Sequence, residues 1–103
     1  MMTDRLFSTI LVELDETTLM TLKYYLREFK AETYMAYGVK VEKYLMGGAD
    51  GRVWELAETN ATPAIYHSKR AVEEMVSKLS EGTVTPVSLH VTVDEYISRN
   101  RQA

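Results

Sequence analysis

A chain of 103 residues with 46% hydrophobic residues falls in the size range of one domain and can bury one core without stabilisation by disulfides or bound metal. Its net charge of -3 excludes a long-range attraction to nucleic acid or to an anionic membrane. The absence of cysteine excludes disulfides, thiolate catalysis and cysteine zinc sites. We therefore expect a single domain over residues 1–103 that is cytoplasmic, with no membrane segment, because no run approaches the roughly 18 apolar residues of a span.

Residues 6–14 predict a first strand, because apolar side chains recur at alternate positions. Both faces of this segment are rather apolar. One face carries Leu6 and Ile10, and the other carries Phe7 and Leu11. The polar residues 15–18 that follow predict a turn, so the first strand ends there.

Residues 19–29 fit two different periods. A helical stripe would consist of Leu19, Leu22, Leu26 and Phe29. A strand face would consist of Met20, Leu22, Tyr24 and Leu26. Threonines and tyrosines in and before this segment favour the extended state, so we predict a strand and keep the helix as the alternative.

Residues 33–45 form the longest alternating run of strand-forming residues in the chain. The glycine-rich loop at 47–51 then predicts a reversal, because glycine adopts positive φ angles at low cost. The chain would return as a hairpin strand over 52–57, with Trp54 and Leu56 facing the core. Residues 64–67 would form a brief last strand or an extended lead-in to a helix.

Two helices are expected at the C-terminal end. Ser68 is a suitable N-cap for a helix that runs to about Ser80 and ends at Gly82. Thr85 and Pro86 suit the start of a second amphipathic helix. Its apolar stripe would consist of Leu89, Val93, Tyr96 and Ile97. The alternative for residues 86–98 is a strand, because several of these residues are β-branched. The predicted fold is α+β, an antiparallel meander of four or five strands with both helices packed on one face.

Two short motifs carry a family resemblance. The first is Tyr37-Gly38-Val39 in the long strand, and the second is a helix that starts at Pro86-Val87-Ser88-Leu89 and reaches Asp94-Glu95. Over about the last two-thirds of the chain, this arrangement resembles a family of short uncharacterised bacterial proteins described as a domain of unknown function. The resemblance implies strands followed by helices, and it implies no activity, substrate or catalytic residue.

No catalytic, cofactor-binding or metal-binding residue is predicted. The two histidines, His67 and His90, lack the spacing that places two ligands on one helix face, and no nucleophile stands beside a base. We therefore expect no enzymatic activity and no cofactor. A weak candidate anion site is the helix start at Ser68, Lys69 and Arg70, although a capped and solvated helix start explains these residues better.

The strongest functional hypothesis concerns the sheet face that would lie opposite the helices. Alternation predicts an interface there, formed by Phe7, Leu11, Leu19, Tyr25, Tyr34 and Tyr44. Such a face is too apolar for open water, and tyrosine suits an interface because it buries a ring and keeps its hydroxyl paired. The chain is therefore predicted to be a non-enzymatic protein-interaction or regulatory module that binds a protein partner or forms a homo-oligomer, with a dimer favoured.

The alternative function is binding of single-stranded nucleic acid. Lys23, Arg27 and Lys40 would share the same face with the tyrosines and provide cations beside a stacking surface. Acidic side chains are predicted on that face as well, namely Glu13, Glu42 and Glu55. Because these carboxylates cancel most of the positive potential, nucleic acid ranks second.

Overall fold

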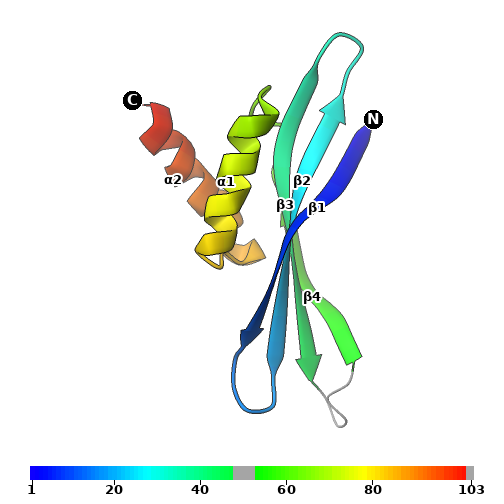
Figure 1. Ribbon diagram of the computed structural model, residues 1–103, viewed down its shortest axis with the longest axis vertical. Helices are drawn as coiled ribbons and strands as arrows, with labels where there is room; N and C mark the ends of the chain where they lie inside the picture. Colours follow the sequence, from blue (N-terminus) through cyan, green and yellow to red (C-terminus); the bar gives the residue numbers. More distant parts are fainter. Residues whose placement is uncertain (48–52, 102–103) are drawn as a thin grey trace.

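The computed structural model describes residues 1–47 and 53–101 and shows a four-stranded antiparallel sheet with helices on one side (Figure 1). The strands are β1 (Met2–Glu13), β2 (Leu19–Lys30), β3 (Met35–Gly47) and β4 (Val53–Ala61). The helices are α1 (Lys69–Glu81), the short 3-10 helix η1 (Pro86–Ser88) and α2 (Leu89–Arg101). The strands lie in the sheet in chain order, so the predicted α+β meander with two C-terminal helices is confirmed.

The segment that fitted two periods is a strand. β2 pairs with β1 on one side and with β3 on the other along its whole length, which makes it a central strand. Its alternating burial follows from this position, because every second side chain points to the helix-covered face. The helical alternative for residues 19–29 is therefore wrong.

Local capping explains where the helices begin and end. The Ser68 hydroxyl accepts a hydrogen bond from the backbone N–H of Ala71 at 3.2 Å, and the N–H of Gly82 donates to the carbonyl of Lys78 at 3.0 Å. Pro86 opens η1, as its fixed φ angle favours. The predicted helix starts are confirmed, and the strand alternative for residues 86–98 is wrong.

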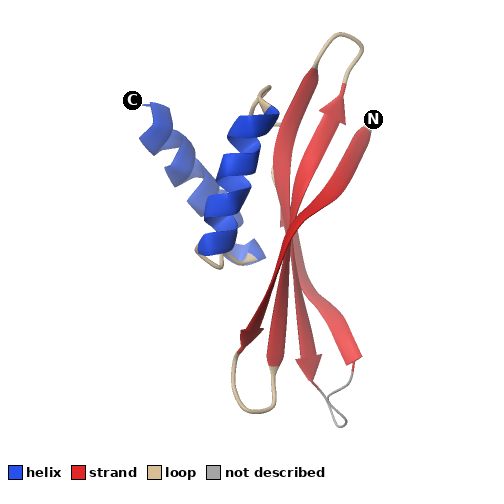
Figure 2. Cartoon of the chain, in the orientation of Figure 1, coloured by secondary structure: helices blue, strands red, loops and turns tan. Residues whose placement is uncertain are grey.

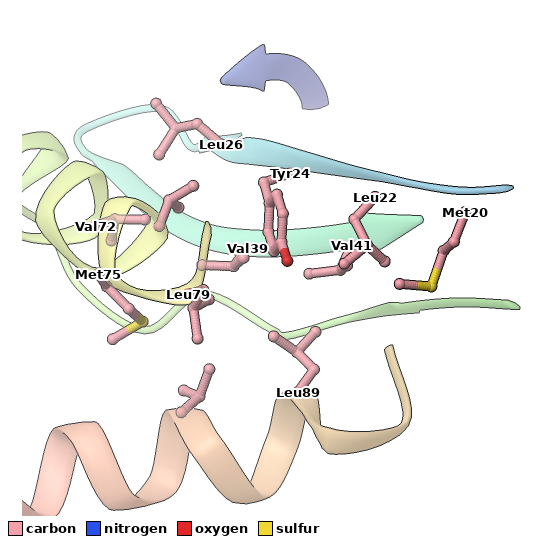
Figure 3. Close-up of a cluster of buried hydrophobic side chains, with 12 residues drawn as sticks. Met20, Leu22, Tyr24, Leu26, Val39, Val41, Val72, Met75, Leu79 and Leu89 are labelled. Atoms are coloured by element: carbon pink, nitrogen blue, oxygen red, sulfur yellow. The ribbon is translucent and has the colours of Figure 1, made fainter. Parts of the chain in front are cut away.

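The core lies between one sheet face and the helices, and we call that face of the sheet the inner face. Figure 3 shows side chains of β2 and β3 meeting those of α1 and the first turn of α2. The buried cluster consists of Met20, Leu22, Tyr24, Leu26, Val39, Val41, Val72, Met75, Val76, Leu79, Leu89 and Val93. One polar group is satisfied inside this layer, because the Tyr24 hydroxyl donates to the Val84 carbonyl at 2.8 Å.

The helices cover only part of the sheet. A helix of 13 residues such as α1 is about 20 Å long, whereas the 12-residue strands β1 and β2 extend for about 40 Å. Figure 2 shows that the sheet continues well past the helices at the end where the β1–β2 turn lies. Neither α1 nor α2, the long helices in the described part of the chain, has the length and apolar character needed to cross a bilayer.

Two irregularities in strand pairing change which residues share a face. The register shifts between Leu6 and Ser8 in β1, so Phe7 occupies the extra position of a bulge. A second shift places one additional residue, Ala57, in β4 opposite the step from Lys43 to Tyr44 in β3. One extra residue reverses the in–out alternation of everything beyond it.

The second bulge overturns a prediction about β4. Leu56 pairs with Tyr44, and Trp54 pairs with Met46, which places both side chains on the face away from the helices. Trp54 and Leu56 are exposed, so the prediction that they face the core is wrong. Glu55 pairs with Leu45 and therefore lies on the inner face, not on the outer one. The glycine-rich turn between β3 and β4, at 48–52, lies outside the described residues.

Residues 62–66 do not form a fifth full strand. They run beside β3 and make one isolated antiparallel bridge between Tyr37 and Tyr66. This segment passes so close to β3 that a Cβ atom at Gly38 would lie 2.6 Å from the carbonyl oxygen of Pro63. Glycine is therefore required at position 38 for close approach.

Candidate functional site

The candidate site is the sheet face opposite α1 and α2, which we call the outer face. It follows from the register, because residues paired across antiparallel strands point to the same side. From β1 and β2 it contains Met2, Asp4, Leu6, Thr9, Leu11, Glu13, Leu19, Thr21, Lys23, Tyr25, Arg27 and Phe29. From β3 and β4 it contains Ala36, Gly38, Lys40, Glu42, Tyr44, Met46, Trp54, Leu56, Thr59 and Ala61.

Four of the six predicted interface residues lie on the outer face. Leu11 pairs with Thr21, Leu19 pairs with Met46, and both sides of each pair point away from the helices. Tyr25 and Tyr44 are on the same face, on neighbouring strands. Sequence alternation placed these four correctly because β2 pairs without a bulge both with β3 and with the part of β1 that follows Phe7.

The other two predicted residues lie elsewhere. Phe7 occupies the β1 bulge and is therefore outside the regular alternation. Leu6, not Phe7, pairs with Tyr25 and lies on the outer face. Tyr34 lies in the turn before β3, and its ring meets that of His67 edge to face at 5.4 Å between centroids. Both side chains are exposed, but neither is part of the paired rows of the outer face.

A charged network occupies the middle of the outer face. Arg27 holds the Asp4 carboxylate with two hydrogen bonds, at 2.8 and 3.3 Å. The Lys40 ammonium group lies 3.5 Å from an oxygen of Asp4 and 3.5 Å from an oxygen of Glu42. The Arg27 hydrogen bonds hold the pKa of Asp4 below its ordinary value, although partial burial opposes this. The network links β1, β2 and β3 across the sheet.

Two tyrosines share the Glu42 carboxylate. The hydroxyls of Tyr25 and Tyr44 donate to the same oxygen of Glu42, at 2.6 and 3.0 Å. Partial burial opposes ionisation of Glu42, but hydrogen bonds from the two hydroxyls and the nearby Lys40 outweigh it, so the pKa of this carboxyl is lowered. Burial, and then the hydrogen bond to Glu42, raise the pKa of each of the two tyrosines.

The rings of the same tyrosines are covered by cations. The Lys23 ammonium group lies 5.0 Å from the centroid of the Tyr44 ring, and that of Lys40 lies 5.5 Å from the centroid of the Tyr25 ring. Both distances are within the range of cation–π attraction. The hydroxyls and rings of Tyr25 and Tyr44 and the ammonium groups of Lys23 and Lys40 therefore have partners within the chain. The middle of the outer face is thus a polar network whose members are already paired.

Exposed apolar side chains surround this network. Leu6 lies beside Tyr25, whereas Leu11, Trp54 and Leu56 lie toward the end of the sheet that the helices do not reach. The sequence pattern did not predict that Leu6, Trp54, Leu56 and Asp4 lie on this face. In β1 a bulge separates Leu6 and Asp4 from Leu11, and in β4 a bulge separates Trp54 and Leu56 from Thr59 and Ala61, which share the outer face.

The weaker candidates are explained by local contacts. Ser68 caps α1 with its hydroxyl, and Arg70 pairs with Glu74 one helical turn later at 3.5 Å. Lys69 is exposed. His67 and His90 lie apart, on the lead-in to α1 and on α2. Among residues 1–47 and 53–101 no three histidine, aspartate or glutamate side chains are grouped as metal ligands. The anion site and the absence of enzymatic activity stay predictions.

Comparison with known proteins places the chain in a family. The model of a family of unknown function, DUF6514, matches residues 3–99, so the chain belongs to this family. The predicted resemblance to a domain of unknown function is confirmed at this level, and the match covers nearly the whole chain. No curated protein and no solved structure matches the chain.

Proposed function

We propose that this member of the DUF6514 family is a protein-interaction module that forms a homodimer by packing two outer faces against each other. The observation that carries the proposal is a sheet face with exposed apolar side chains around a polar network that is already paired. Burying such a face removes apolar surface from water and leaves few polar groups without partners. The dimer would have four layers, with the helices outermost and two sheets inside.

The charges of the outer face favour a second copy over a charged partner. The described residues of the face carry three carboxylates, Asp4, Glu13 and Glu42, and three cations, Lys23, Arg27 and Lys40. Their formal charges sum to zero. A face of one sign would repel a second copy of itself, whereas a neutral face with both signs can be self-complementary across a twofold axis.

The area of the face also suits a dimer. Strands of 12 residues extend for about 40 Å, and four strands spaced about 4.8 Å apart cover a width of about 19 Å, so the projected area of the face is at most roughly 750 Å². A standard stable interface buries about 800 Å² on each partner. Two sheets that stack face to face pack about 10 Å apart, with side chains interdigitating. The whole outer face would therefore be used.

Binding of single-stranded nucleic acid is the second candidate. Lys23, Arg27 and Lys40 do share the outer face with two tyrosines, as the sequence predicted. The cations are engaged within the chain, however, since Arg27 and Lys40 contact carboxylates and Lys23 lies over the Tyr44 ring. Stacking of a base on Tyr44 or Tyr25 would have to displace an ammonium group from the ring. The geometry therefore favours protein over nucleic acid.

Sedimentation velocity of wild type and two double variants tests the proposal. The variant Leu11→Arg, Leu56→Arg places a charge at two outer-face positions whose side chains are 63% and 50% exposed, so the monomer should still fold. The matched control is Val87→Arg, Val91→Arg, with side chains that are 74% and 64% exposed on the helices. We expect wild type and control to sediment as dimers and the outer-face variant as a monomer.

Two outcomes contradict the homodimer. A wild type that stays monomeric at high micromolar concentration rules out self-association, and dissociation of the control variant assigns the interface to the helices. Filter binding with single-stranded DNA and RNA at low salt tests the second candidate. If the protein retains single-stranded DNA or RNA on the filter and a Lys23→Gln, Lys40→Gln variant does not, nucleic acid is the ligand instead.

A further inference from the structure

A groove on the helix side of the molecule is separate from the outer face. It lies between α1, α2 and the extended segment at 62–66, and it has a volume of about 590 Å³. Small-molecule sites in proteins have volumes of about 300–1,000 Å³. The groove therefore has the size of a ligand site.

One wall of the groove is an extended segment that is fixed to β3. The Thr62 hydroxyl accepts a hydrogen bond from the N–H of Val39 at 3.0 Å and donates to the carbonyl of Pro63 at 2.9 Å. Further along, the N–H of Tyr37 donates to the carbonyl of Tyr66 at 2.7 Å. Gly38 lets the wall lie this close to the sheet. The motif Tyr37-Gly38-Val39 therefore serves to hold this wall in place.

The facing wall is the start of α2, which a side-chain amide positions. Asn60 donates from its amide nitrogen to the carbonyl of Pro86 at 3.1 Å, so its oxygen is the acceptor for Nε2 of His90 at 3.1 Å. A neutral His90 then carries its proton on Nε2, and Nδ1 is an acceptor. The second motif, from Pro86 to Leu89, thus sets the position of a histidine that lines the groove.

The floor of the groove is formed by apolar side chains that become accessible where α2 diverges from α1. Figure 1 shows the two helices separating toward the C-terminus of α2. Val93 is still buried where they meet, but Ile97 one turn later is only half-buried. Ile65 and Tyr66 from the extended segment are half-buried as well and complete the floor.

The charged side chains that line the groove are acidic. Glu74 of α1 and Asp94 of α2 stand on facing helices, and no lysine or arginine is among the described residues of the lining. Arg70 pairs with Glu74, but its side chain is 89% exposed, so water screens this pair. An apolar floor between two carboxylates complements a ligand that joins a positive charge to an apolar body.

We propose that this groove binds a small organic ammonium ion, an amine carried on an aromatic or aliphatic body. The apolar part would contact Ile65, Val93 and Ile97. The ammonium group would donate hydrogen bonds to the carboxylates of Asp94 and Glu74. This site is independent of the proposed dimer, because its lining residues lie outside the paired rows of the outer face.

NMR titration of the full chain with phenethylamine tests the proposal. We expect saturable shifts of the backbone amides of Ala71, Val93 and Ile97. Phenethyl alcohol, which has the same body without the charge, should bind at least about tenfold more weakly, as the loss of a charge-assisted hydrogen bond predicts. Asp94→Asn and Glu74→Gln should each weaken amine binding severalfold and leave the affinity for the alcohol nearly unchanged.

Neighbouring residues supply matched controls. Glu95→Gln and Glu73→Gln remove carboxylates one position away on the same helices, and neither residue lines the groove, so amine affinity should stay at the wild-type value. Equal affinity for amine and alcohol, equal loss in the control variants, or the absence of saturable shifts at these amides would each overturn the proposal. Self-association does not enter any of these outcomes, so they are distinguishable from a failure of the proposed dimer.

Discussion

The two faces of the sheet are built from the same strands and differ in what completes them. On the inner face, Leu22 is fully buried under α1 and α2, whereas Leu11 on the outer face is 63% exposed. The inner-face hydroxyl of Tyr24 donates to the loop before η1, whereas the hydroxyl of its neighbour Tyr25 donates sideways to Glu42 in the next strand. The Tyr24 hydroxyl thus depends on a segment outside the sheet, whereas the charges and hydroxyls of the central outer-face network depend on each other.

This difference shows why the outer face can be exposed in a monomer and dry in a complex. The charges and hydroxyls of its central network are paired laterally, so removal of water from above leaves them with partners. Its exposed apolar side chains, Leu6, Leu11, Trp54 and Leu56, are not covered by the helices, since both helices lie on the other side. A second sheet would supply that cover without breaking the network.

The largest expected effect comes from a comparison of two leucine-to-alanine variants, one on each face of the sheet. Leu22→Ala should lower the free energy of unfolding by about 2–5 kcal/mol, because it leaves a cavity in the core. Leu11→Ala should lower it by less than about 1 kcal/mol in the monomer, since the side chain is already largely in water. Urea unfolding at a concentration that keeps the chain monomeric measures both. Similar losses for the two variants would show that the outer face is covered within the chain.

A glycine pair gives the next largest effect. Gly38→Ala forces a Cβ atom to within 2.6 Å of a backbone oxygen, so we expect a loss of about 1–3 kcal/mol in the free energy of unfolding. Gly82→Ala is the control, because the nearest atom to its Cβ would be 3.4 Å away and its φ angle is -83°. Thermal unfolding should place the Gly38 variant well below the Gly82 variant. A reversed order would contradict the close approach of residues 62–66 to β3.

Sequence patterns predicted the parts of the fold that depend on local chemistry. Ser68, Gly82 and Pro86 determine helix ends through caps and a fixed φ angle, so the helices could be placed. β2 could be predicted because threonine and tyrosine favour extended backbone where periodicity was ambiguous. These effects act within a few residues, which is why a single sequence reveals them.

Register and tertiary approach could not be predicted in the same way. The bulges at Phe7 and Ala57 depend on pairing with another strand, and each reverses the face of the residues beyond it. Asp4 was therefore missed as the carboxylate that Arg27 holds, although the cations of the outer face were predicted. The groove was missed because it exists only where three separated segments meet.

A smaller effect compares two adjacent tyrosines on opposite faces. Tyr24→Phe should cost about 1 kcal/mol in the monomer, because the Val84 carbonyl loses its hydrogen bond. Tyr25→Phe should cost less in the monomer, since Glu42 keeps the Tyr44 hydroxyl and Lys40. Burial raises the pKa of Tyr24 to about 12, so its ionisation should be seen only at strongly alkaline pH in a spectrophotometric titration. An equal cost for both variants would argue against lateral pairing on the outer face.

The smallest expected effect concerns the response of the outer-face network to acid. The pKa values of Asp4 and Glu42 are lowered from ordinary values of 3.8 and 4.5, so the unfolded chain binds more protons than the folded chain as the pH falls through this range. The stabilisation is complete above the ordinary values and is lost as the pH falls toward the lowered ones. Asp4→Asn should therefore cost at most about 1 kcal/mol at neutral pH, because the ion pairs are partly solvated. Its difference from wild type should shrink as the pH falls below about 4.

Urea unfolding at a series of pH values measures this difference in the free energy of unfolding, with Glu95→Gln on α2 as the control. A constant difference between Asp4→Asn and wild type across the series would show that Asp4 contributes by packing, not by its charge.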